Sequence, residues 1–154
     1  MKTEEQKNYG GCSCKLIRYQ FSGQPIIAYK CHCLDCQLAS GGGAVAAIWV
    51  NTNDLVITGE LNYHEVIADS GRKITRAFCG QCGTPILAKL SIPNVNGIFA
   101  MSLDNPDIFF PEYEIWTCRT RRWEILNPTS LCFDQGFPSA IIRKHLAANS
   151  LKTK

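Results

Sequence analysis

Three thiols lie within six residues of this chain, at Cys31, Cys33 and Cys36. Cys31 and Cys33 are two residues apart, so their side chains leave an extended backbone on the same face. The Cys-x-x-Cys turn that follows can bring the sulfur of Cys36 to the same point. Thiolates bind zinc, and a tetrahedral site closes at four ligands, so this segment predicts a metal site with one position left to fill. Three buried small side chains are the alternative, but free cysteines are not expected to cluster at ligand spacing.

Two further cysteine pairs frame this segment, one near the start of the chain and one far downstream. Cys12 and Cys14 form a Cys-x-Cys pair. Cys79 and Cys82 form a Cys-x-x-Cys pair with Gly80 inside the turn and Gly83 after it, where we expect the positive φ angles that such a zinc-binding turn needs. The two pairs together supply four thiolates, which complete a tetrahedral zinc site.

The economical assignment of the seven thiols is two metal ions. A closed, structural site is expected on the four residues of the two pairs, Cys12, Cys14, Cys79 and Cys82. An open site, which can be catalytic, is expected on Cys31, Cys33 and Cys36. Spacing alone leaves other partitions open, including His32 or Asp35 as a fourth ligand, and four thiolates also suit iron.

Four further polar or thiol side chains, two of them inside the central motif, are not expected to bind the metal ions. His32 points away from the metal in an extended segment, so we expect it to support the site or lie at the surface. Asp35 is expected to accept hydrogen bonds from turn amides. Cys118 and Cys132 fall outside the motifs, and we interpret both as free thiols without a ligand role.

Three sequence blocks together resemble a known family. They are Gly-Gly-Cys-x-Cys at 10–14, Cys-His-Cys-x-x-Cys-Gln-x-Ala-Ser-Gly at 31–41, and Gly-Arg-x-x-x-Arg-x-Phe-Cys-Gly-x-Cys-Gly-Thr-Pro at 71–85. In this order they resemble the glutathione-dependent formaldehyde-activating enzymes, a family that also includes centromere protein V. The resemblance spans about residues 10–123 and implies a mainly β, Mss4-like fold. It also implies two zinc ions, with the structural and catalytic partition given above.

The activity implied by the resemblance is that of a zinc-dependent carbon–sulfur lyase or synthase acting on an adduct of glutathione and an aldehyde, such as S-hydroxymethylglutathione. The small thiol substrate is anionic, so nearby cations and close backbone approach are needed; Gly42, Arg72 and Arg76 are the candidate substrate-binding residues. Residues 114–123 depart from the family's usual pattern, so substrate specificity can differ. The alternative is a non-catalytic, zinc-stabilised module that binds protein or nucleic acid.

Length and composition favour one domain over residues 1–154, since the chain is near the commonest domain size. The net charge of +3 gives only a weak preference for anionic partners, and nucleic acid is not an expected one. No apolar run resembles a signal peptide or a membrane span. Nine cysteines without a secretion signal indicate a reducing compartment, the cytoplasm.

Strand-like runs separated by turn signals predict a mainly β fold with antiparallel sheets. Residues 1–9 are expected to be frayed, and the strands at 16–21 and 26–29 to form a hairpin. A helical turn is expected at 34–40, stopped by the glycines at 41–43, and a short amphipathic helix at 139–148. The other expected strands are 44–50, buried on both faces, and 55–58, 62–67, 74–78, 85–88, 98–101 and 113–116.

Overall fold

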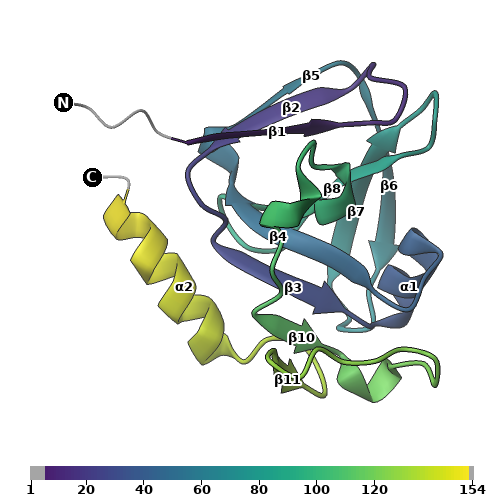
Figure 1. Cartoon of the computed structure of the whole chain (residues 1–154), viewed down its shortest axis with the longest axis vertical. Coiled ribbons are helices and arrows are strands. Elements are labelled where there is room, and N and C mark those ends of the chain that lie inside the picture. Colours follow the sequence, from purple (N-terminus) through teal and green to yellow (C-terminus); the bar gives the residue numbers. More distant parts are fainter. Residues whose placement is uncertain (1–5, 153–154) are drawn as a thin grey trace.

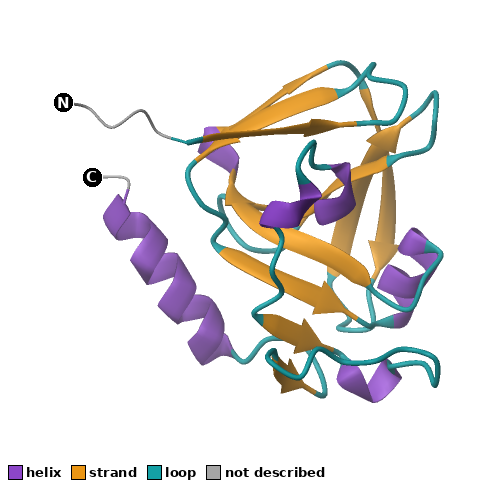
Figure 2. Cartoon of the chain, viewed as in Figure 1, coloured by secondary structure: helices purple, strands orange, loops and turns teal. Residues whose placement is uncertain are grey.

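The computed structural model describes residues 6–152, and over this range the chain forms eleven strands, two α-helices and four short 3-10 helices (Figure 1). The strands are β1 (Lys7–Gly11), β2 (Arg18–Ser22), β3 (Ile27–Cys31), β4 (Val45–Asn51), β5 (Leu55–Thr58), β6 (Leu61–Ile67), β7 (Lys73–Cys79), β8 (Pro85–Lys89), β9 (Val95–Phe99), β10 (Tyr113–Ile115) and β11 (Leu131–Phe133). The α-helices are α1 (Leu34–Ser40) and α2 (Ser139–Lys152), and the 3-10 helices are Thr52–Asp54, Ala100–Ser102, Pro106–Ile108 and Thr117–Arg119. Strands dominate the described chain (Figure 2), as predicted.

A small sheet of three strands, in the order β1-β2-β5, lies at the top of the view in Figure 1. The prediction that residues 1–9 are frayed is wrong for residues 7–9, which belong to β1; residues 1–5 lie outside the described residues. β1 pairs antiparallel with β2 over its whole length, and Asn8 Nδ2 donates to the carbonyl of Gly23 at 2.8 Å. β1 lacks apolar alternation because polar and glycine residues occupy its buried positions, so no strand was predicted there.

A large sheet of eight strands runs in the order β11-β10-β3-β4-β9-β8-β7-β6. The pairs from β3 to β6 are antiparallel, as predicted. β10 instead pairs in parallel with both β3 and β11. The register places Ile115 of β10 opposite Cys31 of β3, so this late strand meets the chain where the central cysteines begin.

The predicted hairpin between residues 16–21 and 26–29 is wrong. These residues correspond to β2 and β3, which belong to different sheets. Both edges of β2 are occupied, one by β1 and the other by β5, so β3 has no free edge of β2 to pair with. The chain crosses from the small sheet to the large sheet through the turn at 23–26.

Two apolar clusters lie on opposite faces of the large sheet. The inter-sheet core packs Phe21 of β2 against Ile48 and Val50 of β4. The second core lies on the other face and includes Trp49 of β4. Successive side chains of a strand alternate in direction, so β4 feeds both cores, and the prediction of a strand buried on both faces is confirmed.

The C-terminal helix α2 covers part of the second core. Ile141, Ile142 and Leu146 pack against it, and the Tyr113 hydroxyl and His145 Nε2 share a hydrogen bond of 2.8 Å. The helix extends beyond the predicted 139–148, ending at Lys152. Neither α2 nor α1 has the length and hydropathy needed to cross a membrane, and no other described helix has them.

Candidate functional site

Four cysteines come together where the two sheets meet. Cys12 and Cys14 follow β1, Cys79 ends β7, and Cys82 lies in the turn to β8. Their sulfur atoms all lie within 4.8 Å of one another, with Cys12 and Cys14 at 3.4 Å and Cys14 and Cys79 at 3.7 Å. A zinc–sulfur distance of 2.3 Å in a tetrahedron places sulfur atoms about 3.8 Å apart, so this set fits a four-coordinate metal ion.

Local turns bring these four sulfur atoms together. On the first side, Lys15 adopts a left-handed conformation at φ 65° and its amide donates to the carbonyl of Cys12. On the other side, Gly83 has the predicted positive φ, at 74°, and its amide donates to the carbonyl of Cys79. Gly80 does not adopt the positive φ we expected. Gly80 packs closely on the Asn62 side chain, which would have to shift if a Cβ were added at this position.

Three cysteines form a second cluster at the junction of β3 and α1. Cys31 ends β3, Cys33 caps the N-terminus of α1 by accepting a hydrogen bond from the Cys36 amide, and Cys36 lies in the first turn. The predicted helical turn at 34–40 is confirmed, and Gly41 ends it in a left-handed conformation. The three sulfur atoms also lie within 4.8 Å of one another, so this set could hold a metal ion and leave one coordination position free.

Hydrogen bonds to the clustered thiols favour the ionised form of Cys33 and of Cys82. Bonds from Cys31 and then Cys36 lower the pKa of Cys33 to about 3, and the charge of Arg76 contributes a smaller lowering. The same bond to Cys33 raises the pKa of Cys31. In the four-cysteine cluster, bonds from Ser13 and then Thr84 lower the pKa of Cys82 to about 4. Thiolates are the form in which cysteine binds metals.

His32 is buried and lies outside the three-cysteine cluster. Its Nε2 is 2.5 Å from Glu114 Oε2, and Glu114 is also fully buried. The second carboxylate oxygen of Glu114 accepts from the Asn127 amide at 2.6 Å, and Lys30 Nζ lies 3.6 Å from Oε2. The histidine between Cys31 and Cys33 is therefore held in place by Glu114 of the neighbouring strand β10. A surface position for His32, one of two that we expected, is wrong.

Two side chains of α1 attach the three-cysteine segment to neighbouring loops. Asp35 Oδ2 accepts from the Asp69 amide at 2.9 Å, while Asp69 Oδ2 accepts from the Leu34 amide at 3.1 Å. Asp35 thus satisfies an amide, as predicted, although that amide belongs to the loop between β6 and β7. Gln37 Nε2 donates to the His32 carbonyl at 2.6 Å, and Gln37 Oε1 accepts from Arg121 Nε at 2.6 Å.

The three predicted substrate-binding residues lie in different surroundings. Arg76, on β7, is near enough for its charge to lower the pKa of Cys33. Arg72 lines a cleft described below. Gly42 is exposed and its amide donates to Ser40 Oγ at 3.1 Å, but no described cavity includes it. Of the three glycines at 41–43, Gly43 is the one in close contact, since a Cβ there would lie 2.2 Å from Glu124.

A cleft of about 580 Å³ opens over the second core. Its walls come from six parts of the chain: strand β3, strand β4, the region 69–74, the loop after β8, the end of β10 and the segment 135–142. Most lining side chains are apolar, among them Ile74, Ile115, Trp116 and Phe137. Trp116 has a left-handed backbone at φ 59°, which is costly for a bulky residue. Arg72 supplies a positive charge to this cleft.

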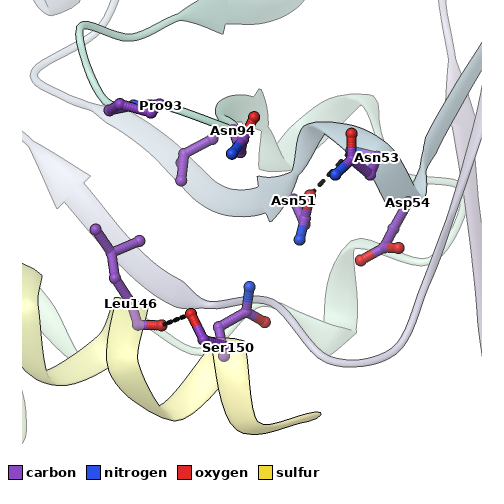
Figure 3. A pocket seen from close by; sticks show the side chains of 9 residues that line it. Asn51, Asn53, Asp54, Pro93, Asn94, Leu146 and Ser150 are labelled. Carbon is purple, nitrogen blue, oxygen red and sulfur yellow. Dashed lines mark hydrogen bonds between the residues drawn. The ribbon is translucent and has the colours of Figure 1, made fainter. Parts of the chain in front are cut away.

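A second cavity, of about 530 Å³, lies between the 3-10 helix Thr52–Asp54 and the last turns of α2 (Figure 3). Asn51, Asn53 and Asn94 contribute amide side chains, and Asn51 Oδ1 accepts from the Asn53 amide at 2.9 Å. Its lining includes no cysteine and no residue of the segments that carry the two thiol clusters. Cys118 and Cys132 also lie outside both clusters, and both are exposed.

Comparison with known proteins agrees with this geometry. The model of the glutathione-dependent formaldehyde-activating enzyme family matches residues 7–119. The chain belongs to this family. Among solved structures, a Rhodobacter sphaeroides protein determined as a structural genomics target superposes with a TM-score of 0.51 at 19% sequence identity, covering 64% of this chain and 92% of that chain. At this identity the likeness shows the fold alone. Among curated proteins, no significant match was found.

Family membership confirms the predicted Mss4-like, mainly β fold, and it supports a function related to glutathione and formaldehyde. The match ends at residue 119, so the segment from 120 onward, including β11 and α2, lies beyond it.

Sequence reasoning missed Glu114 and Asp69. Glu114 is a carboxylate between Tyr113 and Ile115 in a strand whose three residues are all buried. A lone acidic residue in an apolar strand is a usable signal, because a buried carboxylate needs a partner. Asp69 had no comparable signal, since it lies in an ordinary turn and reaches α1 only through the fold.

Replacing Glu114 with alanine is expected to lower the free energy of unfolding by about 3–5 kcal/mol, because His32, Asn127 and Lys30 lose their common acceptor. Urea denaturation followed by circular dichroism measures the change. Glu112→Ala is the matched control, since Glu112 is exposed, and it should change stability by less than about 0.5 kcal/mol. Equal losses in the two variants would contradict a structural role for the buried carboxylate.

Proposed function

We propose that this protein is a zinc-dependent carbon–sulfur lyase or synthase acting on an adduct of glutathione and an aldehyde. In the synthetic direction the thiol of glutathione adds to the carbonyl carbon of formaldehyde. A carbon–sulfur bond forms, the carbonyl π bond opens, and the thiol proton ends on the oxygen, giving S-hydroxymethylglutathione. The family match supports the coarser statement of a glutathione- and formaldehyde-related function.

The observation that carries the proposal is the difference between the two thiol clusters. One has four sulfur atoms, Cys12, Cys14, Cys79 and Cys82, and the other has three, Cys31, Cys33 and Cys36. A four-thiol set completes a tetrahedron and suits a structural zinc, whereas a three-thiol set leaves a position for a substrate. We assign one zinc ion to each cluster on this basis.

Zinc held by Cys31, Cys33 and Cys36 would supply Lewis-acid chemistry, which favours the thiolate form of a coordinating thiol. The chain's own residues provide the setting for this chemistry. Cys31 and Cys33 are almost fully buried, with exposed fractions of 6% and 5%, while Cys36 is half-buried. Access for a small thiol is therefore from the Cys36 side, and the other two ligands are shielded from water.

Charge near the three-cysteine cluster suits an anionic thiol. Three thiolates bring negative charge to the site, and Arg76 places a compensating positive charge close to Cys33. We assign Arg72 and Arg76 to the carboxylates of glutathione, and Gly42, which is exposed just after α1, to close approach of the substrate. A protein with this many reduced thiols suits a reducing compartment, and we propose the cytoplasm.

Direct ligation by glutathione is the test. Cobalt is substituted for zinc and glutathione is titrated while the thiolate-to-metal absorption is recorded. A spectral change is expected, and it should weaken as the pH falls, because a bound thiolate must first lose its proton. The change should be absent in Cys33→Ser and present in Cys118→Ser, which removes an exposed thiol outside both clusters. No change at millimolar glutathione would reject the enzyme and favour a non-catalytic zinc module.

A further inference from the structure

The cleft lies next to the segment that carries the three-cysteine cluster, as two contacts show. Ile115, in its wall, is paired in register with Cys31. Asp69, at its edge, accepts a hydrogen bond from Leu34, which follows Cys33.

Neither glutathione alone nor formaldehyde would fill the apolar part of this cleft. The charged groups of glutathione belong at polar lining residues such as Arg72, because burying them against the apolar wall is costly. Formaldehyde has a single carbon and gains nothing from a large cavity. A cleft of about 580 Å³ is within the usual range of ligand sites, and its apolar lining suits a hydrocarbon group.

Part of the apolar wall comes from outside the family-matched region. Phe137 and Ile142 belong to the segment beyond residue 119, and both line the cleft. Phe137 is fixed by edge contacts with Tyr29 and Trp49, at centroid distances of 5.2 and 5.3 Å. The C-terminal segment of this chain therefore builds a wall that the family match does not account for.

From this juxtaposition we propose that the cleft holds the apolar substituent of an aldehyde larger than formaldehyde, a proposal that rests on the proposed function. The thiol of glutathione adds to the carbonyl carbon of an aliphatic or aromatic aldehyde. The carbon–sulfur bond forms, the π bond opens and the thiol proton passes to oxygen, so that no oxidant or reductant is required. The substituent on that carbon then lies between Ile115, Trp116 and Ile142.

Stable conjugates of glutathione test this proposal. Isothermal titration of the zinc-loaded protein compares S-methylglutathione with S-butyl- and S-hexylglutathione, whose substituents start from the same sulfur. The hexyl conjugate is expected to bind about 10- to 100-fold more tightly than the methyl conjugate, since its additional methylene groups become partly buried. Equal affinities, or no measurable binding of any conjugate, would overturn the proposal.

Two isoleucines of α2 give a matched pair of variants. Ile142→Ser should remove most of the preference for the hexyl conjugate, because Ile142 lines the cleft. Ile141→Ser should keep that preference, because Ile141 packs on the second core without lining the cleft. A preference that survives in Ile142→Ser would count against the assignment, and if this variant does not fold, the conjugate series with the unaltered protein decides the question.

This experiment separates the proposal from the proposed function. An alkylated sulfur offers no thiolate, so the ratio of affinities depends on the cleft and not on ligation at the three-cysteine cluster. Failure of the cobalt titration would reject the enzyme, whereas equal binding of the conjugates would reject only the apolar substituent.

Discussion

Cys82→Ser is expected to give a protein that no longer folds cooperatively. The exposed Cys82 side chain makes little packing contribution, so the substitution removes a ligand and little else. Structural zinc supplies about 10–16 kcal/mol in small peptides, and whole domains are stable by only about 5–15 kcal/mol. The free energy lost with this site is therefore expected to equal or exceed the free energy of unfolding of the whole domain.

Thermal unfolding by circular dichroism, with zinc content measured on the same sample, checks this result. Cys132→Ser is the matched control, because Cys132 is also exposed but lies outside both clusters, and it should melt as the unaltered protein does. A soluble Cys82→Ser protein that melts cooperatively with unchanged zinc content would reject the assignment.

The large effect expected at Cys82 follows from where the four-cysteine cluster lies. Cys12 and Cys14 extend from the small sheet, while Cys79 and Cys82 belong to the hairpin of β7 and β8 in the large sheet. Cys14 and Cys79 are 65 residues apart in sequence. A metal ion here would close a long loop and hold two sheets together, and loop closure is most stabilising when the loop is long.

The local parts of the fold were predictable from the sequence because their signals are local. Apolar runs bounded by turn residues predicted most strands, and the ligand spacing of seven cysteines predicted the two clusters that the structure brings together. The turn at 34–40 was predictable for the same reason, since three glycines follow it directly.

The long-range parts were not predictable. The parallel pairing of β10 with β3 joins residues more than eighty positions apart, and no pattern in β10 specifies its partner. A hairpin between 16–21 and 26–29 was expected because sequential strands usually pair. It does not form because β1 and β5 already occupy both edges of β2. The cleft wall made by Phe137 and Ile142 depends on the C-terminal segment packing against the large sheet, and local sequence patterns do not specify this packing.

Long-range contacts also attach the segment of the three-cysteine cluster to the rest of the fold. The β3 strand below it pairs with β4 and β10, His32 is held by Glu114, and α1 is fastened to the loop between β6 and β7 through Asp69. Cys31 and Cys36 are only five residues apart, so a metal ion here closes a short loop and adds little to stability. Loss of metal from the four-cysteine cluster is therefore expected to unfold the protein, whereas loss from the three-cysteine cluster is expected to leave it folded.

Cys33→Ser is expected to fold normally, to contain about one zinc ion fewer per chain, and to lose its glutathione-dependent activity. Serine is well suited to position 33 because Cys33 caps α1 by accepting a hydrogen bond from the Cys36 amide, and a serine hydroxyl is among the preferred helix caps. The cap survives while the metal ligand is lost. Two thiols remain, one fewer than the three protein ligands of a catalytic zinc site, so zinc is expected to be lost from this cluster.

Three measurements on Cys33→Ser, with Cys118→Ser as the control, separate folding from catalysis. The melting temperature should match that of the control, zinc analysis should show the loss of one equivalent, and the rate of S-hydroxymethylglutathione formation should fall to the spontaneous rate. The spontaneous rate must be subtracted, because thiols add to formaldehyde readily in water. Activity retained with the three-cysteine cluster empty would reject its catalytic role, and a collapse of the fold would show that this cluster, like the four-cysteine one, is structural.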